Sequence, residues 1–210
     1  MKISPDYSLY LCTDRSLMSS DSLEACVEQA VSGGCTVVQL REKDCSAREF
    51  YDLACRVKSI TDAHGVPLII NDRVDIALAV EASGVHVGQK DLPAGAVRRI
   101  MGTDALVGVS VTNREEALKA VCAGADYLGV GAMFTTGTKN DAALVSMEEL
   151  VRIREAVSVP LVVIGGINAA TLPLFHGIGI DGIAVVSAIV ARQDIVGAAS
   201  SLARMFRELK

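Results

Sequence analysis

The sequence predicts an α/β fold, a single-domain (β/α)8 or TIM barrel formed by residues 1–210. Three observations support this prediction. Short apolar runs rich in Val, Ile and Leu alternate with amphipathic stretches, there are eight such runs, and no low-complexity linker or shift in composition divides the chain. A length of 210 residues also suits one small β/α barrel.

Each apolar run is expected to form a strand of a parallel sheet. Helices cover both faces of such a sheet, so its strands are continuously apolar rather than alternately polar and apolar. In chain order the expected strands are Leu9–Thr13, Thr36–Arg41, Pro67–Ile70, Gly84–Val87, Leu106–Val109, Tyr127–Val130, Leu161–Ile164 and Gly182–Val186.

Helical patterns occupy segments between these runs. The clearest are Ser22–Ser32, Ala47–Ala63, Arg114–Ala123, Met147–Ala156 and Ile195–Leu209. The expected N-caps are Asp21, Ser46, Asn113 and Ser146. Ser46 and Asn113 each have a Glu three residues later, as in a capping box. The glycines expected to end helices are Gly65, Gly124 and Gly177.

An open, doubly wound sheet is the alternative fold. It would have about five or six strands, and a dinucleotide-binding version would carry Gly-x-Gly-x-x-Gly after its first strand. The segment after Leu9–Thr13 has no such pattern. The closed barrel is therefore preferred.

Charge and composition argue against several functions. A net charge of −5 and 4% aromatic residues without Trp disfavour nucleic-acid binding, which needs a basic surface and stacking rings. Mean hydropathy is +0.38, yet no apolar run approaches a membrane-spanning length, so no membrane partner is expected. The six cysteines form no CxxC pair and no signal peptide precedes them, which predicts a cytoplasmic protein with reduced thiols.

In this fold the C-terminal ends of the strands carry the active site, and here these ends are polar. Gly165 and Gly166 follow the seventh strand, and Ser187 follows the eighth. Glycines allow the backbone to approach an anion, and the Ser187 amide would lie at a helix start, where negative charge is favoured. A phosphate site is expected here, with a tight turn that binds nothing as the alternative for the glycines.

Three cations also fall on strand-end loops. Arg41, Lys43 and Lys139 are placed to converge on one polyanion. Arg offers a planar fork and Lys a point charge, a combination that suits a diphosphate.

Two carboxylates end the third and fourth strands. Asp72 and Asp91 could hold Mg²⁺ together with substrate phosphates and water. Alternative or additional roles are a helix N-cap for Asp72 and a turn before Pro93 for Asp91.

Histidine is scarce, and no Ser-His or Cys-His pair indicates covalent catalysis. His64 and His176 are expected on loops or helices and His86 inside the barrel, all in structural roles. The strand ends therefore predict a site that works by anion and metal electrostatics.

A series of short motifs lies at these strand ends. In chain order they are Leu9–Asp14, Gln39–Lys43, Asn71-Asp72, Gly88–Pro93, Gly108–Ser110, Thr136–Lys139, Ile164–Ile167 and Val185–Ile189. The ordered set covers almost the whole chain, is highly specific, and resembles the thiamine-phosphate synthase family.

The resemblance implies a transferase of thiamine biosynthesis. It would condense 4-amino-2-methyl-5-(diphosphooxymethyl)pyrimidine with 4-methyl-5-(2-phosphoethyl)thiazole, or the 2-carboxy form of that thiazole, and release diphosphate to give thiamine monophosphate. In this family the reaction is understood as dissociative: diphosphate leaves, the aminopyrimidine carries the cation, and the thiazole nitrogen captures it. Such chemistry needs charge neutralisation, water exclusion and alignment of two substrates.

The resemblance also assigns residues. The pyrimidine diphosphate would be bound by Gln39, Leu40, Arg41, Glu42, Lys43, Asn71, Ser110 and Lys139. The catalytic residues among these would be Arg41, Lys43, Ser110 and Lys139. Asp72 and Asp91 would hold Mg²⁺, the expected cofactor. The thiazole phosphate would be bound by Thr136, Gly137, Thr138, Gly166, Val186 and Ser187.

Ala132 and Thr135 depart from the family pattern, which often has proline at these positions. Loops without proline have more freedom in the unfolded state. Two other functions on this fold stay open: a thiazole-phosphate tautomerase, which typically lacks the full diphosphate apparatus, and a regulator that binds phosphometabolites without catalysis. The sequence leaves the oligomeric state open, a homo-oligomer included.

Overall fold

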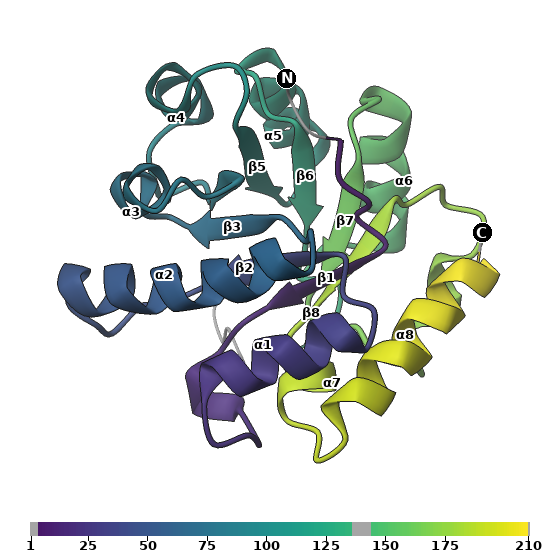
Figure 1. Cartoon of the computed structure of the whole chain (residues 1–210). Coiled ribbons are helices and arrows are strands. Elements are labelled where there is room, and N and C mark those ends of the chain that lie inside the picture. The colour runs from purple at the N-terminus through teal and green to yellow at the C-terminus, as the bar shows by residue number, and fades with distance from the viewer. Residues whose placement is uncertain (1–3, 136–143, 210) are drawn as a thin grey trace.

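The computed structural model describes residues 4–135 and 144–209, which form a closed barrel of parallel strands (Figure 1). The strands are β1 Leu9–Cys12, β2 Val37–Leu40, β3 Leu68–Asn71, β4 Gly84–Val87, β5 Leu106–Val111, β6 Tyr127–Val130, β7 Leu161–Ile164 and β8 Gly182–Val185. Neighbours in the chain are neighbours in the barrel, and β1 pairs with β8 through Leu9 and Ile183. This pairing confirms the predicted fold and excludes the open sheet.

Helices surround the barrel (Figure 1). They are α1 Leu23–Ser32, α2 Ala47–Ala63, α3 Val74–Ala79, α4 Ala94–Met101, α5 Arg114–Cys122, α6 Met147–Ala156, α7 Ser187–Val190 and α8 Ile195–Leu209, with 3-10 turns η1 Arg15–Leu17 and η2 Leu172–Phe175. Helix α1 packs between α2 and α8. The ring of helices thus continues across the β8–β1 closure.

Helix starts follow local side-chain chemistry. Ser46 and Glu49 form the predicted capping box at α2, and the Asn113 side chain caps α5. The cap of α1 is Ser22, whose hydroxyl accepts from the Ala25 amide, so the prediction of Asp21 was one residue too early. Ser and Asp are similarly favoured at this position, and adjacent candidates cannot be ranked by residue type.

The apolar residues form two separate clusters. One lies between the sheet and the helices, because alternate strand residues point outward. The other fills the inside of the barrel and contains Tyr7, Tyr10, Cys12, Val37, Ile69, Leu106, Tyr127, Val162 and Ala184. The inside is a packed core, and only its C-terminal end remains open for a ligand.

Two ion pairs lie at the opposite, N-terminal end of the barrel. Arg98 of α4 donates to the Gly124 carbonyl and to Asp126, and Asp126 Oδ2 also accepts from the Val107 amide at 2.8 Å. Arg154 of α6 and Asp181 repeat the arrangement, with Asp181 accepting from the Leu161 amide at 2.8 Å. Both pairs fasten strand starts to the outer helices.

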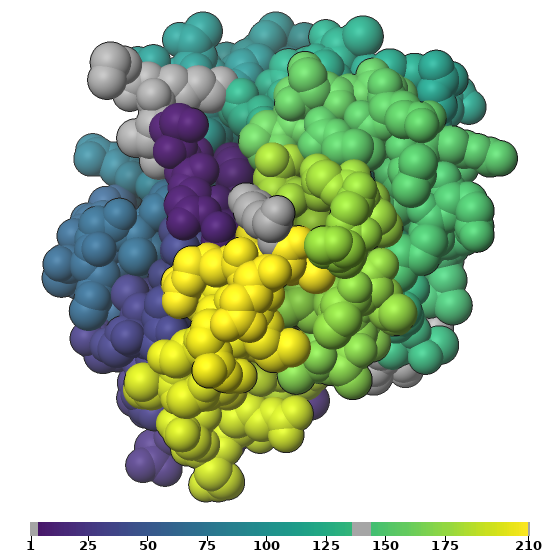
Figure 2. Space-filling view, turned by 90° about the vertical axis from the view of Figure 1, so that its right-hand side faces the viewer, coloured from purple at the N-terminus to yellow at the C-terminus, as the bar shows by residue number. Residues whose placement is uncertain are grey.

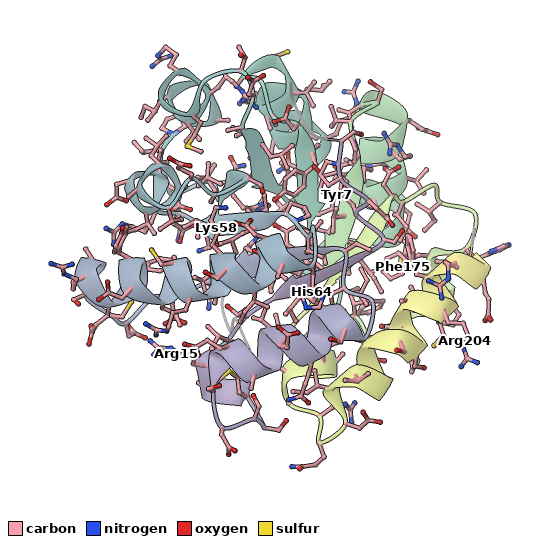
Figure 3. All side chains as sticks on the ribbon, viewed as in Figure 1. Tyr7, Arg15, Lys58, His64, Phe175 and Arg204 are labelled. Atoms are coloured by element: carbon pink, nitrogen blue, oxygen red, sulfur yellow. The ribbon has the colours of Figure 1, made fainter. Side chains whose placement is uncertain are left out.

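Tyr7 and Arg15 lie on either side of β1, before its first and after its last residue, and mark the two ends of the barrel (Figure 3). His64, at the end of α2, bonds to Glu28 of α1 in the helical layer. Helix α8 covers the outside of the barrel beside the N-terminal segment (Figure 2). Within the two described ranges, no helix has the length and apolar character needed to span a bilayer.

Candidate active site

A cavity of about 1030 Å³ opens at the C-terminal ends of the strands. Its walls include nine residues that the sequence singled out: Gln39, Arg41, Lys43, Asn71, Asp91, Ser110, Gly166, Val186 and Ser187. They come from six different strand ends or strand-end loops, and the fold alone brings them together. One cavity thus has an ionic side, on β2 to β4, and a side of glycine and hydroxyl groups, on β7 and β8.

The loop after β2 carries the two cations of the ionic side. The Arg41 amide donates to Thr13 Oγ1 at 3.0 Å, and the Thr13 amide donates to the Gln39 carbonyl at 3.0 Å, so the end of β1 fixes the start of this loop. The Arg41 guanidinium lies 4.0 Å from Asp14 Oδ2, and Lys43 Nζ lies 3.2 Å from Asp72 Oδ2.

Asp72 has an unusual backbone. Its φ of 61° is in the left-handed region, which Asp tolerates better than most residues, and its amide donates to the His86 carbonyl at 2.9 Å. Helix α3 begins at Val74 with Arg73 in the N-cap position. Asp72 is therefore not a helix cap, and the turn aims its carboxylate at Lys43.

The two aspartates of the metal prediction are close together. Burial raises the pKa of the Asp72 carboxyl, and a hydrogen bond and charge repulsion from Asp91 raise that pKa further, against the opposing effect of Lys43. Asp91 Oδ2 accepts from the Gly88 amide at 2.7 Å. Asp91 thus has the predicted turn role and also faces Asp72.

This pair fits a hard divalent cation. Two neighbouring carboxylates provide oxygen donors of the kind that Mg²⁺ prefers, and a cation beside them would offset the charge repulsion that Asp91 exerts on Asp72. Among the described residues no group of three or more His, Cys, Asp or Glu side chains is placed to hold a metal. An ion at Asp72 and Asp91 would therefore need further ligands from substrate and water.

The turn after β7 forms the opposite wall. Gly165 and Gly166 have φ values of 94° and 68°, and a Cβ at Gly166 would lie 2.7 Å from Phe134 Cβ. The Gly166 carbonyl accepts from Asn168 Nδ2 at 3.0 Å and from Thr171 Oγ1 at 3.1 Å. The turn requires glycine for its backbone conformation and is held rigidly by its own hydrogen bonds.

Three described residues of the predicted site, Leu40, Glu42 and Asp72, are not among those that line the cavity. Asp72 contacts it only through Lys43 and Asp91. Leu40 is fully buried in the outer cluster, because alternation along β2 turns its side chain away from Gln39 and towards the helices. The Glu42 side chain is 5% exposed and accepts from Arg15 of η1, so it supports the loop instead of lining the cavity. For Leu40 and Glu42 the predicted substrate contact was wrong.

Four predicted residues, Thr136, Gly137, Thr138 and Lys139, lie outside the described ranges. The base of their loop is described on both sides. Ala132 is buried, and its carbonyl accepts from the Val145 amide at 2.8 Å.

Several residues of the cavity were not predicted from the sequence. Tyr10, Tyr127 and Gln89 line the cavity, and so does His86, which lies inside the barrel as expected but contacts Ser110. Strand alternation could have revealed them, since Tyr10 is two residues before Cys12 and His86 is two before Gly88, on the inward face.

These features define a class: β/α barrels that take anionic small molecules in a cavity at the C-terminal strand ends. The family model described as thiamine monophosphate synthase matches residues 9–189. The chain belongs to this family.

Comparison with individual proteins supports the same family assignment. The chain is 62% identical to a thiamine-phosphate synthase of Clostridium beijerinckii, over 98% of this chain and 99% of the relative, and 56% identical to one of Clostridium botulinum, over 100% and 98%. The solved structure of thiamine phosphate pyrophosphorylase from Pyrococcus furiosus superposes with a TM-score of 0.90, at 37% identity and 97% coverage of both chains.

Proposed function

We propose that this protein is a Mg²⁺-dependent thiamine-phosphate synthase. It would join 4-amino-2-methyl-5-(diphosphooxymethyl)pyrimidine to 4-methyl-5-(2-phosphoethyl)thiazole and release diphosphate. With the 2-carboxy form of the thiazole, CO₂ would be lost as well. The supporting observation is that Lys43 and Asp91 line one side of a cavity whose other side is the Gly165-Gly166 turn, and that the Asp72 carboxylate lies beside both of them. Residues 1–210 would act as one catalytic domain.

The ionic side would take the diphosphate. Arg41 and Lys43 donate hydrogen bonds to phosphate oxygens more strongly than neutral groups do. As the carbon–oxygen bond breaks, negative charge accumulates on the leaving diphosphate, and these fixed cations stabilise that charge. When bound at Asp72 and Asp91, Mg²⁺ would neutralise further phosphate charge.

The opposite side would hold the nucleophile. The Gly166 and Ser187 backbone amides and the Ser187 hydroxyl can donate to the thiazole monophosphate, which keeps the thiazole nitrogen facing the pyrimidine carbon. The new carbon–nitrogen bond then forms with the electron pair of that nitrogen, and no protein nucleophile is required. The cavity has to align two substrates and to exclude water.

Cytoplasmic location is part of the proposal. All six cysteines fall within the described ranges, and none forms a disulfide. This is the usual state in a reducing compartment.

A product assay tests the function. Purified protein with both substrates and Mg²⁺ should form thiamine monophosphate and diphosphate in equal amounts. Aromatisation of the thiazole without condensation would indicate a tautomerase instead, and calorimetric binding without turnover would indicate a regulator.

A pair of variants tests the site. Lys43→Ala should lower kcat/KM for the pyrimidine diphosphate about 10- to 100-fold, the effect of a charged hydrogen bond. Lys58→Ala is the matched control, because Lys58 pairs with Asp62 on α2 in the outer layer. Equal activity of the two variants would contradict the proposed role of Lys43.

A further inference from the structure

A chain of four hydrogen bonds crosses the inside of the barrel along the wall of the cavity. Gln39 Nε2 donates to the Tyr10 hydroxyl at 2.9 Å, and the Tyr10 and Tyr127 hydroxyls are 2.8 Å apart. The Tyr127 hydroxyl lies 3.0 Å from His86 Nδ1, and His86 Nε2 lies 2.8 Å from Ser110 Oγ. Both ends of the chain, Gln39 and Ser110, line the cavity.

The donors and acceptors along these hydrogen bonds follow one order, which begins at the Gln39 amide. The Gln39 NH₂ group can only donate, so the Tyr10 oxygen accepts and the Tyr10 hydrogen is available to Tyr127. With the Tyr10 hydrogen directed at the Tyr127 oxygen, the Tyr127 hydroxyl would in turn donate to His86 Nδ1. A neutral imidazole that accepts at Nδ1 carries its proton on Nε2 and donates to Ser110 Oγ. All four bonds then have one donor and one acceptor.

The tyrosines can keep this order because they stay neutral. Burial raises the pKa of Tyr10 and of Tyr127 well above the ordinary value. Both hydroxyls therefore stay protonated near neutral pH, and each remains both donor and acceptor.

The neighbouring strands leave space for the central bond. A Cβ at Gly108 would lie 2.3 Å from the Tyr127 hydroxyl oxygen and 2.4 Å from His86 Nδ1, and a Cβ at Gly129 would lie 3.0 Å from His86 Cε1. The absence of side chains at both positions allows the imidazole and the phenol to meet.

We propose that Tyr10, Tyr127 and His86 are positioning residues, which orient the Ser110 hydroxyl as a hydrogen-bond donor towards the cavity. Since His86 occupies an acceptor site of Ser110 Oγ, the serine hydrogen turns away from the imidazole. Phosphate oxygens only accept hydrogen bonds, so a donor is the form that a diphosphate requires. With the chain reversed, Ser110 would donate to His86 and present lone pairs to the anion. The kinetic part of this inference rests on the proposed function.

The direction of the chain is tested by the His86 tautomer in the ligand-free protein. Nitrogen-15 and carbon-13 NMR of labelled histidine, with a His86→Gln variant for assignment, should find the proton on Nε2. Tyr10→Phe and Tyr127→Phe should each give a mixture of tautomers. A proton on Nδ1 in the wild type, or an unchanged tautomer in both variants, would overturn the proposal.

Tyr7→Phe is the matched control. Tyr7 is a buried tyrosine of the same cluster, and its ring packs at a tilt against that of Tyr127 with ring centroids 4.8 Å apart, but its hydroxyl is not one of the links in the hydrogen-bond chain. This variant should keep the Nε2 tautomer and stay within twofold of wild-type kcat/KM.

A double-variant cycle separates positioning from packing. Tyr127→Phe should lower kcat/KM for the pyrimidine diphosphate about tenfold, the effect of one well-placed hydrogen bond. The KM for the thiazole phosphate should be unchanged. In a Ser110→Ala background the same substitution should change kcat/KM less than twofold, because its effect passes through Ser110.

Equal effects in both backgrounds would assign Tyr127 to packing alone and overturn the positioning role. The proposed function fails separately: in that case the wild type would show the Nε2 tautomer and yet form no thiamine monophosphate.

Discussion

Lys43 Nζ lies 3.2 Å from Asp72 Oδ2, so a cation expected to bind phosphate is paired, in the ligand-free protein, with a carboxylate expected to bind metal. The same Asp72 carboxylate faces Asp91. Binding of Mg²⁺ at the aspartates would weaken the hold of Asp72 on Lys43 and leave this ammonium group available to the diphosphate. Metal and diphosphate should therefore bind cooperatively.

Asp72→Asn should abolish most of the activity and the cooperativity between Mg²⁺ and diphosphate. Asn tolerates the left-handed backbone at this position, whereas Ala would add strain. Titration calorimetry of diphosphate with and without Mg²⁺ measures the coupling. Unchanged coupling in both Asp72→Asn and Asp91→Asn would rule out the metal role.

The same Asp72→Asn variant should be more stable than the wild type in metal-free buffer. The pKa of Asp72 is raised in the folded state, so its contribution to stability is present at low pH and is lost as pH rises through the raised pKa. The gain in Tm should therefore be largest near neutral pH and vanish in acid. Thermal unfolding at several pH values measures it, and a lower Tm at neutral pH would contradict the reasoning.

Arg98→Met should lower the free energy of unfolding by about 2–3 kcal/mol, since it removes the guanidinium that bonds the partly buried Asp126 carboxylate and the Gly124 carbonyl. Because the pair lies at the N-terminal end of the barrel, kcat/KM should stay within twofold. Arg152→Met is the control, as its pair with Glu149 is exposed, and it should cost under about 0.5 kcal/mol. Urea unfolding compares them.

Gly108→Ala should destabilise the fold by about 2–3 kcal/mol, because the added methyl group overlaps Tyr127 and His86. Activity should fall as well, through the displaced hydrogen-bond chain. Gly95→Ala, where the nearest atom would be 3.8 Å away, should be neutral or slightly stabilising. Equal Tm values for the two variants would contradict the packing described around Tyr127.

Thiol reactivity should differ sharply among the cysteines. Cys122 is exposed, whereas Cys12 is buried and burial raises the pKa of its thiol to about 12. Iodoacetamide near pH 8 should label Cys122 in the folded protein and Cys12 only after denaturation, as mass spectrometry of the peptides can show. Rapid labelling of Cys12 in the folded protein would disagree with its place in the core.

The fold could be predicted from the sequence because its strand runs are short, apolar and separated by strong helix signals. Two strands end later than predicted, because a polar residue continues the strand: β3 includes Asn71, and β5 extends through Ser110 to Val111. Those residues pair with a neighbouring strand, and one-dimensional patterns carry no information about partners.

The site was predicted less completely. Motif order brought out Arg41, Asp72 and Asp91, but it also included Leu40, whose direction is set by alternation within β2. His86 was assigned a structural role because its partner Ser110 is 24 residues away in the chain. The tyrosine pair that completes the hydrogen-bond chain is separated by 117 residues, and only barrel closure makes these residues neighbours.

The pairing of Leu9 with Ile183 has a consequence for synthesis of the protein. Until β8 leaves the ribosome, the growing sheet has two open edges. The backbone groups of β1 that later bond to β8 stay unpaired during this time. The nascent chain is therefore exposed to aggregation for most of its translation. Chaperone dependence should be greatest just before β8, Gly182–Val185, emerges, and a ligand can assist folding only after that point.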